Sequence, residues 1–217
     1  MEKAVTALFN QLLLLFSIMQ GINAEPLTPK IYYKQNANDF AKGADSVHIV
    51  IEDEENFSFW LGEAKFYNKL ENARLDKVVE SVHDTLTSDK IKKENAIILG
   101  IKDLDELEIP EILLNKIKRL LDKDKSLDKL KPHLHVPILL LHECEITSKT
   151  KIINKEYLDS IREQYADRAT VYFKKQIEKC KDDIFMYSDI CFHLMLVPVP
   201  NKEEIVNMFI NRAKTFR

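Results

Sequence analysis

Residues 57–67 read FSFWLGEAKFY, a stretch rich in aromatic residues that predicts a β-strand. Side chains alternate between the two faces of a strand, so Glu63 and Lys65 continue an apolar row, whereas Trp60 lies on the opposite face and belongs to the core. An unpaired charge is costly to bury. Glu63 and Lys65 must therefore neutralise each other, reach water or meet another charged group.

The segment before this strand predicts its antiparallel partner. Residues 46–52 (SVHIVIE) alternate and are β-branched, and a polar turn, DEEN, separates them from the aromatic strand. Pairing Glu52 with Phe57 across this turn brings Asp45 to about the level of Ala64, beside the two charges. A register shifted by one residue would still leave Asp45 close to them.

The rest of the chain alternates between helical and strand patterns. Apolar residues at helical spacing over 75–86 predict an amphipathic helix after the aromatic strand. The other elements expected from pattern are strands at 30–34, 95–101, 135–143 and 190–200, and helices at 1–24, 110–121, 154–182 and from Asn201 to the end. Pro137 suggests that its strand lies at an edge or only begins there. Together these elements predict a mixed β-sheet flanked by helices in a single domain, residues 1–217.

Composition narrows the possible functions. The chain has 217 residues and a net charge of −3, so it lacks the general basic character of many nucleic-acid-binding proteins, and such binding would need a local patch or metal ions. The charged stretch at 122–132 is expected to be a solvated connection, with a phosphate-contact patch as the alternative. No CxxC spacing occurs. We expect three buried thiols in a reducing compartment, namely Cys144, Cys180 and Cys191.

Two further features receive structural interpretations. The apolar N-terminal segment could be a secretory signal, but Asn10 and Gln11 interrupt it, and a core helix in a cytoplasmic protein without a membrane span is the preferred interpretation. Four histidines lack the paired spacing of metal ligands and are given no role: His133, His135, His142 and His193.

The charged residues at the end of the hairpin suggest a chemistry. Two carboxylates, Asp45 and Glu63, would provide the oxygen ligands that Mg²⁺ prefers, with substrate phosphate completing the shell. Lys65 could orient the attacking water and offset negative charge on the phosphate. This combination favours phosphodiester hydrolysis. The simpler alternative is a neighbouring ion pair that contributes little stability.

A family resemblance strengthens the catalytic interpretation. Residues 43–49 (GADSVHI), followed by the hairpin and by residues 60–67 (WLGEAKFY), resemble the D…(D/E)-x-K core of the PD-(D/E)XK nucleases. More specifically, the chain resembles the HamA family, the nuclease subunit of the bacterial Hachiman antiphage system. Further segments that resemble this family are LLLLF, KIYYK, VPILLLHE and FHLMLVPVP.

The resemblance implies a restriction-endonuclease-like core and assigns roles to residues. Asp45 and Glu63 would be metal ligands, with the Ala64 carbonyl as an additional ligand, and Lys65 would be the catalytic lysine. The cofactor would be Mg²⁺, with Mn²⁺ possible. Many such enzymes add a glutamate from the first helix, where this chain has Gln11. Either Glu2 substitutes for it, or the site uses two carboxylates, or metal binding is weakened.

The resemblance also implies a biological setting. The chain would be a metal-dependent DNase that acts in antiphage defence and is held in check by a helicase partner, HamB. A housekeeping or restriction-type nuclease of the same fold is one alternative. The other is a degenerate module that binds the helicase or DNA without cleaving. The sequence does not indicate an oligomeric state.

Overall fold

The computed structural model of the protein describes residues 46–87, 91, 109–121 and 127–215. Its strands and helices alternate along the chain, as the sequence patterns predict. The strands are β1 (Ser46–Ile51), β2 (Phe57–Tyr67), β3 (Leu134–Glu143) and β4 (Cys191–Val199). The α-helices are α2 (Asn72–Thr85), α4 (Glu111–Leu121), α5 (Glu145–Lys149), α6 (Lys155–Cys180) and α7 (Lys202–Thr215). Short 3₁₀ turns cover Leu127–Lys129, Lys131–His133 and Tyr187–Asp189.

The four described strands form one mixed sheet in the order β1-β2-β3-β4. The first pair is antiparallel and the next two pairs are parallel. Ile51, not Glu52, pairs with Phe57, so the register differs by one residue from the expected one. The turn explains the shift, because the Glu52 and Asp53 amides both donate to the Asn56 carbonyl and Glu52 thereby becomes part of the turn. The hairpin itself is confirmed.

β3 corrects the expectation drawn from Pro137. The strand lies between β2 and β4, and Pro137 is its fourth residue, so it is neither at an edge nor at the strand's start. Pairing between β2 and β3 is recorded on both sides of this position but not at Pro137 itself, and the register is the same before and after it. A missing N–H thus interrupts the ladder locally without displacing it.

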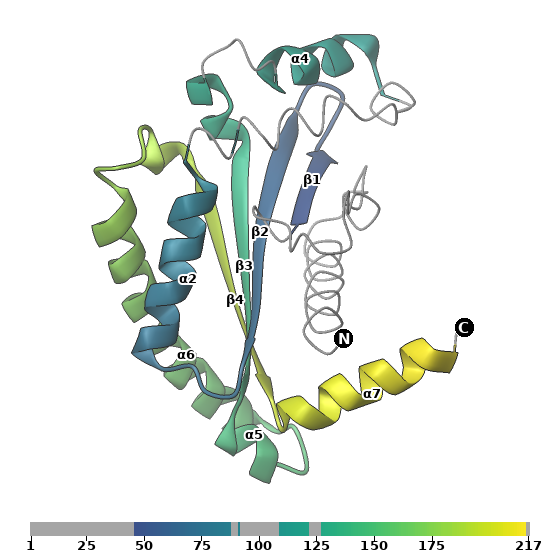
Figure 1. Ribbon diagram of the computed structural model, residues 1–217, viewed down its shortest axis with the longest axis vertical. Coiled ribbons are helices and arrows are strands. Elements are labelled where there is room, and N and C mark those ends of the chain that lie inside the picture. The colour runs from purple at the N-terminus through teal and green to yellow at the C-terminus, as the bar shows by residue number, and fades with distance from the viewer. Residues whose placement is uncertain (1–45, 88–90, 92–108, 122–126, 216–217) are drawn as a thin grey trace.

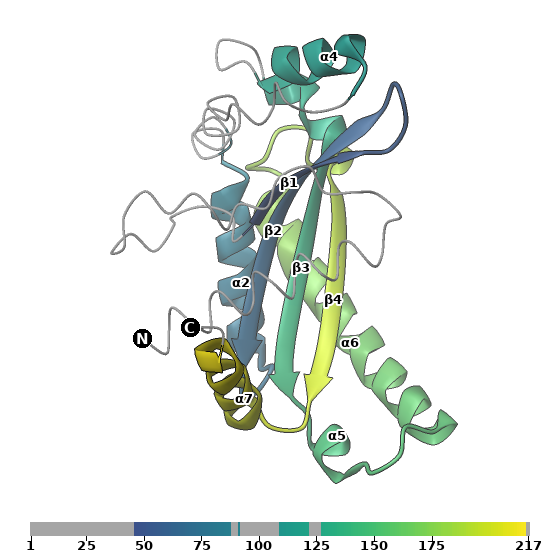
Figure 2. The same cartoon turned by 90° about the vertical axis from the view of Figure 1, so that its right-hand side faces the viewer.

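Helices cover both faces of the sheet. α2 and α6 lie side by side on one face, and α7 lies on the other (Figures 1 and 2). The larger apolar core lies under α2 and α6 and includes Phe57, Phe59 and the wholly buried Tyr172. A smaller core on the α7 face includes Trp60 and Val206. The alternating strand residues of β2 therefore divide between two cores, and Trp60 is buried as expected.

Local signals in the sequence account for the helices. The predicted stripe of α2 is buried, including Leu75, Val78 and Val82. The Asn154 side chain accepts a hydrogen bond from the backbone at the start of α6, and Asn201 does the same at the start of α7. Such caps satisfy amides that have no partner within the helix.

The charged stretch after α4 is less solvated than expected. Leu130 and Lys131 are both buried. The Lys131 ammonium donates to the Phe185 carbonyl and lies over the ring of the same residue. Burial lowers the pKa of Lys131 below its usual value. This part of the stretch is therefore packed against the turn that precedes β4.

Several expectations lie outside the described residues. These are the N-terminal helix with Glu2 and Gln11, the strands at 30–34 and 95–101, and Asp45. Within the described part of the chain, no helix is long and apolar enough to cross a membrane.

Candidate functional site

Glu63 and Lys65 lie on the face of β2 that is covered by α2 and α6. The Glu63 side chain is 4% exposed and the Lys65 side chain is 34% exposed, and the ammonium contacts Oε1 of the carboxylate. The two charges thus form an ion pair whose acid is buried and whose base reaches water. Of the alternatives that the sequence left for these two charges, the structure shows that they neutralise each other and that the lysine also reaches water.

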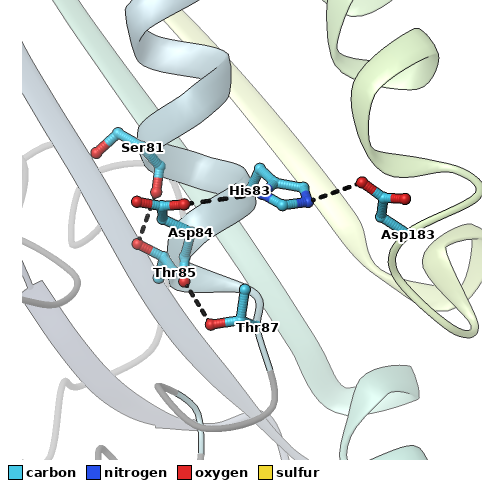
Figure 3. A network of polar contacts seen from close by, with 6 residues as sticks. All are labelled: Ser81, His83, Asp84, Thr85, Thr87 and Asp183. Atoms are coloured by element: carbon cyan, nitrogen blue, oxygen red, sulfur yellow. Dashed lines mark hydrogen bonds and ion pairs between the residues drawn. The ribbon is translucent and has the colours of Figure 1, made fainter.

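Helix α2 supplies a further contact to the same carboxylate. Ser81 donates a hydrogen bond from Oγ to Glu63 Oε1 at 2.7 Å. Ser81 directly precedes Val82, a member of the buried stripe, so the helix that packs on β2 also brings a hydroxyl to Glu63. Figure 3 shows Ser81 in the last turns of this helix. Lys65 and Ser81 together fix the orientation of the carboxylate.

Tyr172 on α6 belongs to the same neighbourhood. Its side chain is wholly buried, and within the described residues its hydroxyl has no hydrogen-bond partner. Burial raises the pKa of Tyr172 well above its usual value, and electrostatic interactions with Cys180 and Glu63 act in the same direction. The phenol therefore stays protonated and adds no charge to the site.

Polar contacts at the ends of α2 and α6 hold the two helices together. His83 Nε2 lies 3.3 Å from Oδ2 of Asp183, a residue beyond the end of α6 (Figure 3). His83 Nδ1 lies 3.8 Å from Oδ1 of Asp84. An ion pair joins Asp76 of α2 to Lys175 of α6. Because α2 carries Ser81, these contacts help to position the hydroxyl that donates to Glu63.

The described residues bring together part of the predicted site. Glu63 and Lys65 are in contact, and Ala64 between them is buried with its side chain on the α7 face. Asp45 lies outside the described residues. It directly precedes Ser46, which pairs with Gly62, the neighbour of Glu63.

The donor chemistry fits a hard cation. A carboxylate oxygen and a backbone carbonyl are the ligands that Mg²⁺ and Mn²⁺ accept, and Glu63 and Ala64 offer one of each. An ammonium beside such a ligand can balance charge on a phosphate. The same geometry would also serve as a buried structural ion pair.

Sequence reasoning missed a second cluster of ligand-type side chains. His135, Cys191 and His193 present ligand atoms that all lie within 4.8 Å of one another. Cys191 is exposed, which corrects the expectation of three buried thiols, whereas Cys144 and Cys180 are buried as expected. The signal in the sequence was the Cys191-x-His193 spacing, which places two ligand-type side chains on one face of a strand. The third member, His135, lies on another strand and could not be linked to them from the sequence.

The fold and the charged pair define a mixed α/β protein in which an antiparallel hairpin, joined to parallel strands, carries an acid-x-lysine motif. The model of the HamA family matches residues 13–213, nearly the whole chain. The chain therefore belongs to the HamA family, and its membership indicates a role in antiphage defence together with a partner of the Hachiman system. No curated protein and no solved structure matches the chain.

Proposed function

We propose that this protein is a metal-dependent DNase that hydrolyses DNA phosphodiester bonds as the effector of an antiphage system. The observation that carries the proposal is the contact between Glu63 and Lys65, on the strand of a hairpin whose other strand begins directly after Asp45. Membership of the HamA family supports the same conclusion. A core of the PD-(D/E)XK type is part of the proposal.

The proposed metal site uses hard oxygen ligands. Asp45, Glu63 and the Ala64 carbonyl would hold Mg²⁺, or Mn²⁺ in its place. The ion would act as a Lewis acid on the phosphate. Lys65, whose ammonium contacts the carboxylate, would leave this contact to orient the attacking water and to balance charge on the phosphate.

The proposed partner is a HamB-like helicase that restrains the nuclease in the cytoplasm. Glu63 is buried under α2 of the chain itself, so a DNA phosphate would approach from the side of the partly exposed Lys65, and a helicase that covers this side would block cleavage. Release by the helicase would then expose the pair.

A second candidate is a nuclease-like module that binds DNA or the helicase without cleaving. The same burial of Glu63 favours it, since a carboxylate that is 4% exposed and paired with lysine serves structure equally well. Catalysis is the stronger candidate, because structure alone does not require a lysine there: an apolar pair of similar volume is often as stable as a buried ion pair.

Plasmid degradation by the purified protein tests the proposal. The wild type, Lys65→Met and the exposed control Lys174→Met are compared with Mg²⁺, with Mn²⁺ and with chelator, each with and without the helicase. Without the helicase we expect metal-dependent cleavage by the wild type and the control, and none by Lys65→Met. The helicase should reduce the cleavage by the wild type and the control. Equal cleavage by Lys65→Met would remove the lysine from catalysis. DNA or helicase binding without cleavage under every condition would support the non-cleaving module.

Metal binding is tested separately by calorimetry. Glu63→Gln and Asp45→Asn each remove a charge while keeping the side chain's shape, so both should weaken Mg²⁺ binding. Unchanged affinity in either variant would exclude that residue as a ligand.

A further inference from the structure

A cluster of two imidazoles and a thiol lies at the beginning of β3 and β4. His135 pairs with Cys191 across these parallel strands, and Pro137 pairs with His193. Residues two apart on a strand share a face, so all three side chains project from the same face of the sheet. This is the face of Trp60 and α7, opposite to the face that carries Glu63.

The distances suit coordination of one ion. His135 Nδ1 and His193 Nε2 are 2.9 Å apart, and the thiol completes a group of ligand atoms that lie within 4.8 Å of one another. In a tetrahedral zinc site with Zn–N near 2.05 Å and Zn–S near 2.3 Å, the two nitrogens lie about 3.3 Å apart and sulfur lies about 3.6 Å from each. Small side-chain movements would bring the three atoms to these positions.

The surroundings hold the ligands in place. The Trp60 ring stacks on His135 with centroids 4.7 Å apart and on His193 with centroids 4.8 Å apart. Both histidines are half-buried, so the packing around them limits the movement of their rings. Cys191 is exposed, so the cluster opens to solvent on its side.

We propose that His135, Cys191 and His193 bind Zn²⁺ through two nitrogens and one thiolate, with water in the fourth position. Nitrogen and sulfur ligands select zinc over Mg²⁺, so this site is distinct from the oxygen site proposed at Glu63. A bound ion would link β3 to β4 where both strands begin. Zinc binding at this site does not require nuclease activity.

A competing interpretation needs no metal. One imidazole can simply donate a hydrogen bond to the other, with both rings packed on Trp60. In that case Cys191 is an ordinary surface thiol. The two interpretations differ in whether the thiol and both imidazoles act together.

The chain provides its own probe for metal binding. Trp60 is its single tryptophan and touches both histidines, so Co²⁺ at the site should quench the intrinsic fluorescence. Co²⁺ bound to a thiolate also gives a near-ultraviolet charge-transfer absorption, and Zn²⁺ should abolish both signals by displacement. Excess Mg²⁺ should leave them unchanged.

The test compares metal-free wild type with Cys191→Ser and His193→Asn, and with the controls Cys144→Ser and His83→Gln. Circular dichroism first verifies that each variant is folded. Loss of one ligand should weaken Co²⁺ binding by more than about 100-fold, beyond the loss typical of residues that only support the ligands. The controls should bind as the wild type does. Zn²⁺ should also slow alkylation of Cys191 in the wild type but not in His193→Asn.

Two results would overturn the proposal. One is a folded wild type that shows no thiolate absorption with Co²⁺ and no protection of Cys191 by Zn²⁺. The other is equal metal binding by the wild type, Cys191→Ser and His193→Asn, which would place the ion elsewhere.

Discussion

Replacing Lys65 by methionine should separate the structural role of the ion pair from its catalytic role. Methionine keeps an apolar stem of similar length but leaves the Glu63 carboxylate without the ammonium. Breaking a fully buried pair costs about 3–5 kcal/mol, whereas exposed pairs contribute about 0–1 kcal/mol. Glu63 is 4% exposed and Lys65 is 34% exposed, so this pair lies between the two cases. We expect a loss of about 2 kcal/mol in the free energy of unfolding.

Thermal and urea unfolding measure this loss. For a chain of this size, 2 kcal/mol corresponds to a decrease in Tm of about 4–8 °C. The double variant Glu63→Gln/Lys65→Met removes the buried charge, and its amide oxygen can still accept the Ser81 hydroxyl. Its stability should return to within about 1 kcal/mol of the wild type, because replacing both partners avoids an uncompensated charge. DNA cleavage should be absent from both variants.

A Lys65→Met variant as stable as the wild type would show that the carboxylate does not depend on the lysine. A double variant less stable than Lys65→Met would show that the unpaired charge on Glu63 is not the cause of the loss. Recovery of stability together with cleavage would refute the catalytic assignment while leaving the structural one intact.

Three further predictions concern individual side chains. Ser81→Ala should lower the free energy of unfolding by about 1.5–3 kcal/mol, because it removes a hydrogen bond to the charged Glu63, and urea titration measures the change. At pH 8, iodoacetamide should modify Cys191 in the folded, metal-free protein but not Cys180, whose thiol is wholly buried and has its pKa raised to about 11. Mass spectrometry that finds both cysteines modified equally would contradict this. Burial lowers the pKa of His142, so the unfolded chain takes up this proton first as the pH falls below about 6.5, and stability should decrease with acidification until the folded pKa is reached. Tm values between pH 7.5 and pH 5 should therefore fall less steeply for His142→Gln than for the wild type.

Local patterns in the sequence determined most of the described elements. Alternation over 57–67 gives β2 and places Glu63 and Lys65 on one face, since a strand's period of two holds in any fold. Spacing at helical period likewise fixes α2 and its buried stripe. The acid-x-lysine motif could be found in the sequence because both residues lie on one strand.

Tertiary structure decided what surrounds these residues. Ser81 reaches Glu63 only because α2 folds back over β2, and no local pattern shows how deeply the carboxylate is then buried. Pro137 occupies a central strand because pairing on both sides of it outweighs one missing hydrogen bond. His135 and His193 meet for a related reason. Their strands are far apart in the chain, and only the parallel register between β3 and β4, set by packing of the whole sheet, brings their side chains together.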